Sequence, residues 1–160
     1  MRELGRRLTP DELQRTLRRC PGDMPEYARA VMSRPIRVRR ATAAEVDLVI
    51  ALDTEAMSGR DRGADLKAAQ STRRLLVAER GDRTVGYATQ GRFFEYDFLE
   101  LLVVREGERR SGVATALVNA VDTAAESGKL FTSTDRSNVP MRRLCQRLGF
   151  EPSGVIHNLD

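Results

Sequence analysis

The most apolar run of the chain, Asp97 to Val104, leads through a polar stretch into a long amphipathic pattern. The run is short and rich in Leu, Val and Phe, which predicts a buried, central strand. From Gly112 to about Ser127, apolar residues recur at helical spacing, and Gly128 follows as a stop signal. A buried strand that continues through a polar connection, Arg105 to Ser111, into such a helix indicates a sheet with helices packed on it.

The remaining patterns predict an α/β (α+β) domain over residues 36–160 and an N-terminal helical extension over residues 1–35. Start and stop signals place two short helices in that extension, at about residues 9–20 and 25–33. The order of elements favours a mixed, mostly antiparallel twisted sheet flanked by helices. We expect strands at 36–40, 75–79, 84–94, 97–104, 130–134 and 150–156, helices at 43–56, 112–127 and 138–148, and a loop with a further helical turn from 57 to 74.

Composition limits the class of protein. With 41% apolar and 31% charged residues, the 160-residue chain has the make-up of a globular domain, and no apolar run approaches the ~20 residues of a membrane span. The two cysteines, Cys20 and Cys145, lie far apart and the single histidine, His157, has no ligands at metal spacing, so we expect neither a disulfide framework nor a metal. Residues 1–8 lack the apolar segment of a secretory signal, and we place the protein in the cytoplasm.

The positive charge is concentrated in the N-terminal quarter. Residues 1–40 hold 11 Arg/Lys against 5 Asp/Glu, which leaves 16 against 18 for the remainder. Such a segment favours contact with nucleic acid or an acidic partner in one interpretation, and a solvated helical face in the other. It carries one aromatic residue and no known binding motif, so nucleic acid is an unlikely partner.

The segment from Arg109 to Thr115 has the features of an anion site. It reads Arg-Arg-Ser-Gly-Val-Ala-Thr and opens the long helix, where backbone N–H groups and the partial positive charge of the helix end favour a phosphate. Gly112 and Ala114 are small enough to let a diphosphate approach the backbone. The segment is neither a P-loop nor a dinucleotide fingerprint, and a plain connection is the alternative interpretation.

Three linked features resemble the GNAT superfamily of N-acetyltransferases: the strand from Leu99 to Val104, the RxxGxA segment from Arg109 to Ala114, and Asn138 followed by a helix that ends in Gly149-Phe150. The resemblance spans about residues 36–156 and implies a GNAT-like fold, an acyltransferase activity, acetyl-CoA as co-substrate and an amine acceptor. It further implies that the diphosphate of acetyl-CoA rests on the loop, that the pantetheine arm lies along the strand, and that Asn138, also a candidate helix cap, contacts the coenzyme. The implied coenzyme-binding residues are Leu102, Val103, Val104, Arg109, Arg110, Ser111, Gly112, Val113, Ala114, Thr115 and Asn138.

Acetyl transfer to an amine requires a base for the amine and an acid for the departing thiolate. Glu100 is the candidate base, because strand alternation groups it with the apolar residues Phe98, Leu102 and Val104, and family members often carry a glutamate on this strand. The alternative is a glutamate turned to solvent in the substrate groove. Cys145 stands where the family usually has a tyrosine acid, so the acid role passes to Cys145, Tyr96 or water.

The departure at Cys145 leaves two other functions open. Cys145 also fits a small buried residue in the stripe of Met141, Leu144 and Leu148, and a GNAT-like module that binds acetyl-CoA without catalysis is then the first alternative. The second is a nucleic-acid-associated protein that acts through residues 1–35. The chain also ends before the family's last strand, so the N-terminal helices or a second subunit, as in a homodimer, would cover the sheet edge.

Overall fold

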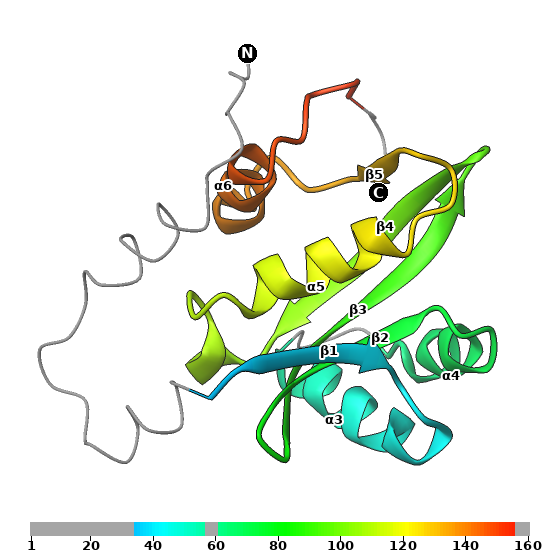
Figure 1. Ribbon diagram of the computed structural model, residues 1–160, viewed down its shortest axis with the longest axis vertical. Coiled ribbons are helices and arrows are strands. Elements are labelled where there is room, and N and C mark those ends of the chain that lie inside the picture. The colour runs from blue at the N-terminus through cyan, green and yellow to red at the C-terminus, as the bar shows by residue number, and fades with distance from the viewer. Residues whose placement is uncertain (1–33, 57–60, 156–160) are drawn as a thin grey trace, which may run out of the picture. The chain divides into compact units, whose positions relative to one another are not determined.

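The computed structural model describes residues 34–56 and 61–155 (Figure 1). The helices expected in residues 9–33, and His157, lie outside the described residues. The chain divides into two compact units with their boundary between Ser133 and Thr134. The first contains the sheet and three of the helices, and the second contains the C-terminal helix, so each is described by itself.

Five strands form one sheet in the order β1-β2-β3-β4-β5. The first four strands form three antiparallel pairs, and β5 pairs parallel with β4, which confirms the expected mixed, mostly antiparallel sheet. The middle strand is β3, whereas the sequence favoured residues 97–104 as the central strand. The strands are β1 (Ile36–Arg40), β2 (Leu75–Arg80), β3 (Arg83–Phe93), β4 (Tyr96–Val104) and β5 (Leu130–Thr132).

One face of the sheet is covered by α3 (Val46–Ala56) and α4 (Gly63–Ser71), and the other by α5 (Val113–Thr123) (Figure 1). A short 3₁₀ turn, η1 (Ala43–Glu45), leads into α3 with a capping box between Thr42 and Glu45. Capping satisfies the first amides of this turn, and the observed start agrees with the helix expected at 43–56.

The region expected to be a loop, residues 57–66, contains the start of α4. Residues 57–60 lie outside the described part, but the helix begins at Gly63 and runs for nine residues. Its apolar content is low, and Leu66 and Ala69, three positions apart, are its buried residues. Tertiary packing of this narrow stripe, rather than intrinsic propensity, therefore holds the helix, and sequence alone underestimated it.

The core beneath α3 and α4 contains one buried polar cluster. Asp53 on α3 accepts hydrogen bonds from the Tyr87 hydroxyl at 2.5 Å and from Arg62 Nη1 at 3.0 Å. Burial, then the hydrogen bond to Asp53, raises the pKa of Tyr87 well above its ordinary value, so the phenol remains a donor. Because Arg62 is the N-cap residue of α4, this cluster fixes where α4 begins. The surrounding apolar residues are Val49, Leu52, Leu66, Ala69, Leu75, Val77 and Val103.

The second unit, described from Thr134 to Val155, contains α6 (Val139–Arg147). Asn138 caps this helix, since its side chain accepts a hydrogen bond from the Met141 amide at 3.1 Å. Gly149 adopts a left-handed conformation after the helix, as its stop signal predicted. The strand expected from Phe150 was wrong: residues 150–155 form no strand, and Pro152 and Gly154 within that segment both disfavour one.

Candidate functional site

Strand β4 carries a β-bulge at Glu100. Thr89 of β3 pairs with Leu101, and the next residue, Gln90, pairs with Leu99, which leaves Glu100 as an extra residue without a partner on β3. Beyond the bulge the alternation shifts, because Leu101 packs against the core beneath α3 while Leu102 faces the α5 side. The expectation that Glu100 shares a face with Leu102 and Val104 is therefore wrong, and bulges of this kind are frequent next to active sites.

The same point of β4 is where β5 stops pairing with it. The parallel pairing covers Asp97 to Leu99 only, and the Thr132 hydroxyl makes a final bond of 3.0 Å to the Leu99 carbonyl. From Glu100 to Val104, no strand in the described part of the chain pairs with this side of β4. The strand thus presents unpaired backbone donors and acceptors along this stretch.

The start of α5 is open to an anion. Gly112 is the N-cap residue in a left-handed conformation (φ 93°), no side chain caps the helix, and its first turn contains no acidic residue. The first intrahelical bond runs from the Ala116 amide to the Gly112 carbonyl, so the three amides of residues 113–115 precede the helical ladder. Those amides and the helix dipole favour a negatively charged ligand.

A buried ion pair holds the loop that leads into α5. After β4, a 3₁₀ turn, η2 (Glu106–Glu108), places Glu108 3.1 Å from Arg80 of β2, and both side chains are almost fully buried. Arg80 also donates to the Ser111 hydroxyl at 2.9 Å, and that hydroxyl donates to the Glu108 carbonyl at 2.7 Å. The Ser111 carbonyl also accepts a hydrogen bond from Arg80 at 3.4 Å, so the side chain and the carbonyl of Ser111 are both engaged within the protein.

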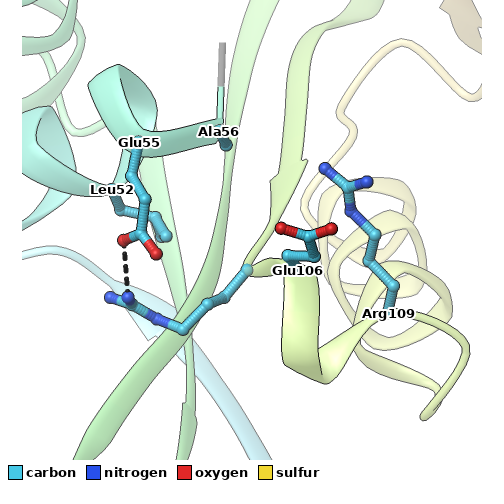
Figure 2. A pocket seen from close by; sticks show the side chains of 6 residues that line it. Leu52, Glu55, Ala56, Glu106 and Arg109 are labelled. Carbon is cyan, nitrogen blue, oxygen red and sulfur yellow. Dashed lines mark hydrogen bonds and ion pairs between the residues drawn. The ribbon is translucent and has the colours of Figure 1, made fainter. Parts of the chain in front are cut away.

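Two arginines of this loop are exposed beside the helix start. Arg109 and Arg110 form no ion pair within the part of the chain that the structure describes, and Arg110 has a left-handed backbone (φ 64°). A small pocket of about 100 Å³ lies between the end of α3 and the loop. Glu106 and Arg109 project on the side opposite α3 (Figure 2). Across it, Glu55 pairs with Arg105 at 2.7 Å (Figure 2). The lining residues are Leu52, Glu55, Ala56, Arg105, Glu106 and Arg109.

Glu100 is exposed rather than buried among apolar residues. Its side chain is 40% accessible, and its Oε2 atom lies 3.4 Å from Arg74 Nη1. The Glu100 side chain lies against the backbone of Gly91, where an added Cβ would come within 2.7 Å of Glu100 Cγ. The expectation of a desolvated carboxylate was thus wrong, and the alternative of a solvent-facing carboxylate describes its surroundings.

Comparisons with known proteins identify the family. The sequence profile of the acetyltransferase (GNAT) family matches residues 46–150, most of the chain. The chain belongs to the GNAT acetyltransferase family. This acetyltransferase resembles a GNAT-family acetyltransferase from Bacillus cereus ATCC 10987, with 27% identity over 79% of this chain and 89% of the other and a TM-score of 0.75. A search of the curated proteins gives no match.

More distant solved structures share the fold. The aminoglycoside N-acetyltransferase AAC(6')-Iy, solved with a bisubstrate analogue, is 21% identical over 79% of this chain and 98% of the other, with a TM-score of 0.65. The diaminobutyrate acetyltransferase EctA from Paenibacillus lautus, solved with diaminobutyric acid and coenzyme A, is 21% identical over 70% of this chain and 73% of the other, with a TM-score of 0.58. The predicted family, fold and enzyme class are confirmed.

The sequence-predicted site residues of the acetyltransferase fall into two groups. Those from Glu100 to Thr115 lie along β4 and the start of α5 in the first unit. Asn138 and the half-buried Cys145 belong to α6 and its cap in the second unit. Tyr96 begins β4, where its ring contacts Phe131 at 5.3 Å between centroids.

Sequence reasoning missed Arg74 and Gly91, the two residues that surround Glu100. An isolated glycine inside the expected strand at 84–94 was a signal for close approach of another group. Arg74 carried no such signal. Among the described residues, no cluster of metal-ligating side chains is present, and no helix is long and apolar enough to cross a membrane.

Proposed function

We propose that this GNAT enzyme transfers the acetyl group of acetyl-CoA to a primary amine by direct attack of the amine on the thioester. The observation that carries the proposal is the start of α5, where a left-handed Gly112 opens a helix with no side-chain cap and no acidic residue in its first turn. An uncapped, positively polarised helix end beside Arg109 and Arg110 suits the diphosphate of the coenzyme.

The unpaired edge of β4 suits the rest of the coenzyme. In this proposal the backbone of Leu102, Val103 and Val104 hydrogen-bonds the pantetheine arm in place of the missing strand. At a rise of ~3.3 Å per residue, Glu100 lies roughly 13 Å before the strand's end, which leaves room for an extended arm between the helix start and the carboxylate. Asn138 serves as a further contact in addition to its capping bond.

Glu100 is proposed as the base and Cys145 as a candidate acid. A lysine-like amine is neutral to about one part in a thousand near pH 7.4, so a carboxylate that accepts its proton, directly or through water, accelerates attack. The exposed position of Glu100 keeps it within reach of water and of an incoming amine. When the C–S bond breaks, the proton that the thiolate receives comes from Cys145, Tyr96 or water.

The structural neighbours support an amine as the acceptor class. AAC(6')-Iy is solved with an aminoglycoside-based bisubstrate analogue and EctA with diaminobutyric acid, and both carry amines. Because the identities are near 20%, neither acceptor is assigned to this enzyme. The cytoplasmic location, the homodimer and the separation into residues 1–35 and 36–160 stay predictions from the sequence.

Calorimetric titration with CoA tests the proposal through two glycine variants. Gly112→Ala and Gly128→Ala both force an alanine into a left-handed conformation, and the new Cβ would meet only an ordinary contact with Ile36 at 3.7 Å in the first and nothing within 4 Å in the second, so each should lower stability by about 1–2 kcal/mol. Only Gly112→Ala should also weaken CoA binding, by roughly tenfold. Wild-type protein without affinity for CoA would refute the proposal. Binding without amine-dependent CoA release from a broad amine panel would favour the non-catalytic module.

A further inference from the structure

A second pocket lies at the end of the sheet away from the start of α5. It has a volume of about 270 Å³ and is lined by the end of β1, the residues between α4 and β2, the outer part of β3, the start of β4 and the residues after α5. An eleven-residue helix is roughly 16 Å long, so this pocket is separate from the helix start proposed for the diphosphate. Its lining residues are Arg40, Thr72, Arg73, Arg74, Gln90, Gly91, Arg92, Asp97, Ala124 and Glu126.

The charge of this pocket is positive. Its lining contains four arginines and two carboxylates. The buried carboxylate of Asp97 is already engaged, because it accepts hydrogen bonds of 2.9 Å each from the backbone amides of Glu126 and Ser127 and from the side-chain amide of Gln90. Glu126 is exposed. The arginines of this pocket, which we call the arginine pocket, are therefore not neutralised by its acidic residues.

Arg40 has a buried hydrogen-bond donor without an acceptor among the described residues. Its Nη1 atom is buried without a hydrogen-bond partner in the described part of the chain, and its Nη2 donates only to the neutral Gln90 side chain at 3.3 Å. No ion pair of Arg40 occurs among residues 34–56 and 61–155. A buried guanidinium nitrogen without an acceptor is unfavourable, and a carboxylate or phosphate oxygen from a ligand would satisfy it.

The arginine pocket adjoins Glu100. Arg74 donates to the Gln90 carbonyl at 3.1 Å and to Glu100 at 3.4 Å, so one guanidinium belongs both to the pocket wall and to the surroundings of the proposed base. Gly91, another wall residue, supports the Glu100 side chain. An anionic group bound in the pocket and an amine at Glu100 could therefore belong to the same small molecule, with only a short chain of atoms between them.

We infer that the acceptor is a small amine that also carries an anionic group, a carboxylate or a phosphate, and that the arginine pocket binds this group. The inference rests on the proposed acetyl transfer and names its substrate class. Arginine pairs with both anions through planar, bidentate hydrogen bonds, and the pocket volume suits a group of that size rather than a large antibiotic. Arg74 would then divide its hydrogen bonds between the anion and Glu100.

Matched amine pairs test the inference by steady-state acetyl transfer. Lysine against cadaverine and ornithine against putrescine compare a carboxylate with hydrogen, and phosphoethanolamine against ethanolamine compares a phosphate with a hydroxyl. We expect the anionic member of at least one pair to have a kcat/KM at least tenfold higher, and the pair that responds identifies the anion. Equal values for the two members of every pair that shows measurable turnover would overturn the inference while leaving acetyl transfer intact.

Two variants locate the effect. Arg40→Gln should reduce the preference for the anionic amine to within about threefold, through the KM of the amine, without altering the KM for acetyl-CoA. Arg37→Gln removes an exposed arginine from the same strand but outside the pocket and should leave both constants unchanged. A preference that persists in Arg40→Gln would place the anion elsewhere.

Anion binding to the CoA-saturated enzyme covers the case in which no amine of the panel reacts. With the helix start occupied by CoA, calorimetric titration with inorganic phosphate and with acetate should show saturable binding that Arg40→Gln weakens at least tenfold. Absence of binding, or binding that Arg40→Gln leaves unchanged, would overturn the inference. Failure of CoA itself to bind would count against the proposed function instead.

Discussion

At the scale of single residues, the carboxylate of Glu100 is positioned by its neighbours rather than by burial. The bulge leaves Glu100 without a partner on β3, and its side chain lies against the backbone of Gly91. Arg74 pairs with its Oε2 atom. An exposed ion pair of this kind contributes less than about 1 kcal/mol to folding. Changes here should therefore affect the reaction more than stability.

Gly91→Ala tests this position without removing the carboxylate. The added methyl group would collide with the Glu100 side chain and displace it, so we expect kcat to fall by roughly 10²-fold, the low end for loss of proton transfer. The midpoint of thermal unfolding should shift by only a few degrees. Gly154→Ala, which meets no atom within 4 Å, is the matched control. An unchanged kcat in Gly91→Ala would argue against Glu100 as the base.

The sequence predicted which residues are candidates for the site, but it did not predict the surroundings of each one. The sequence predicted Glu100 from its place on the strand, and it predicted that Ser137 or Asn138 caps the following helix; the structure shows that Asn138 is the cap. The bulge could not be predicted, because it depends on how β3 and β4 pair rather than on either strand alone. A one-residue shift changed the face on which Glu100 lies and with it the expected burial.

At the scale of elements, the loop between β4 and α5 depends on the Arg80–Glu108 ion pair. Glu108→Gln removes the carboxylate from a buried guanidinium, which should cost about 3 kcal/mol and lower the unfolding midpoint by roughly 6–12 °C. Since Arg80 also holds Ser111 beside Gly112, CoA affinity should fall as well. Glu55→Gln, in an exposed pair with Arg105, should cost less than about 1 kcal/mol. Calorimetric unfolding distinguishes the two, and equal losses would contradict this account.

Most elements were predictable because their signals are local. The apolar stripe of α5 and its start at Gly112 both lie within the segment that they define. Helix α4 was expected only as a helical turn within a loop, because two buried residues rather than a local signal hold it against the sheet. The expected final strand was wrong because no local signal reports whether a partner strand exists. The residues that line the arginine pocket come from β1, the segment before β2, β3, β4 and the segment after α5, so no single segment could reveal it.

At the scale of the whole molecule, Asp97 ties the start of β4 to the chain that follows α5. The backbone hydrogen bond from Ser127, then the Ser127 hydroxyl, the Gln90 side chain and the Glu126 amide hold the pKa of Asp97 at about 2, below its ordinary 3.8, against the opposing effect of burial. A pKa that is lower in the folded state gives stability that is complete above the unfolded value and is lost as the pH falls through the folded value. A shift of this size corresponds to about 2 kcal/mol.

The stability of the fold should therefore decline between about pH 4 and pH 2, and Asp97 should account for a measurable share. Urea unfolding at pH 7, 4, 3 and 2 should show Asp97→Asn less stable than wild type by about 2 kcal/mol at pH 7. That difference should shrink to below about 1 kcal/mol at pH 2, where the carboxyl of Asp97 is about half protonated in the folded protein and almost fully protonated in the unfolded one. Asp82→Asn, in the exposed β2–β3 turn, should follow the wild-type curve throughout. If the loss of stability in Asp97→Asn were the same at pH 7 and pH 2, the hydrogen bonds of Asp97 would stabilise the fold through their geometry alone, independently of its charge.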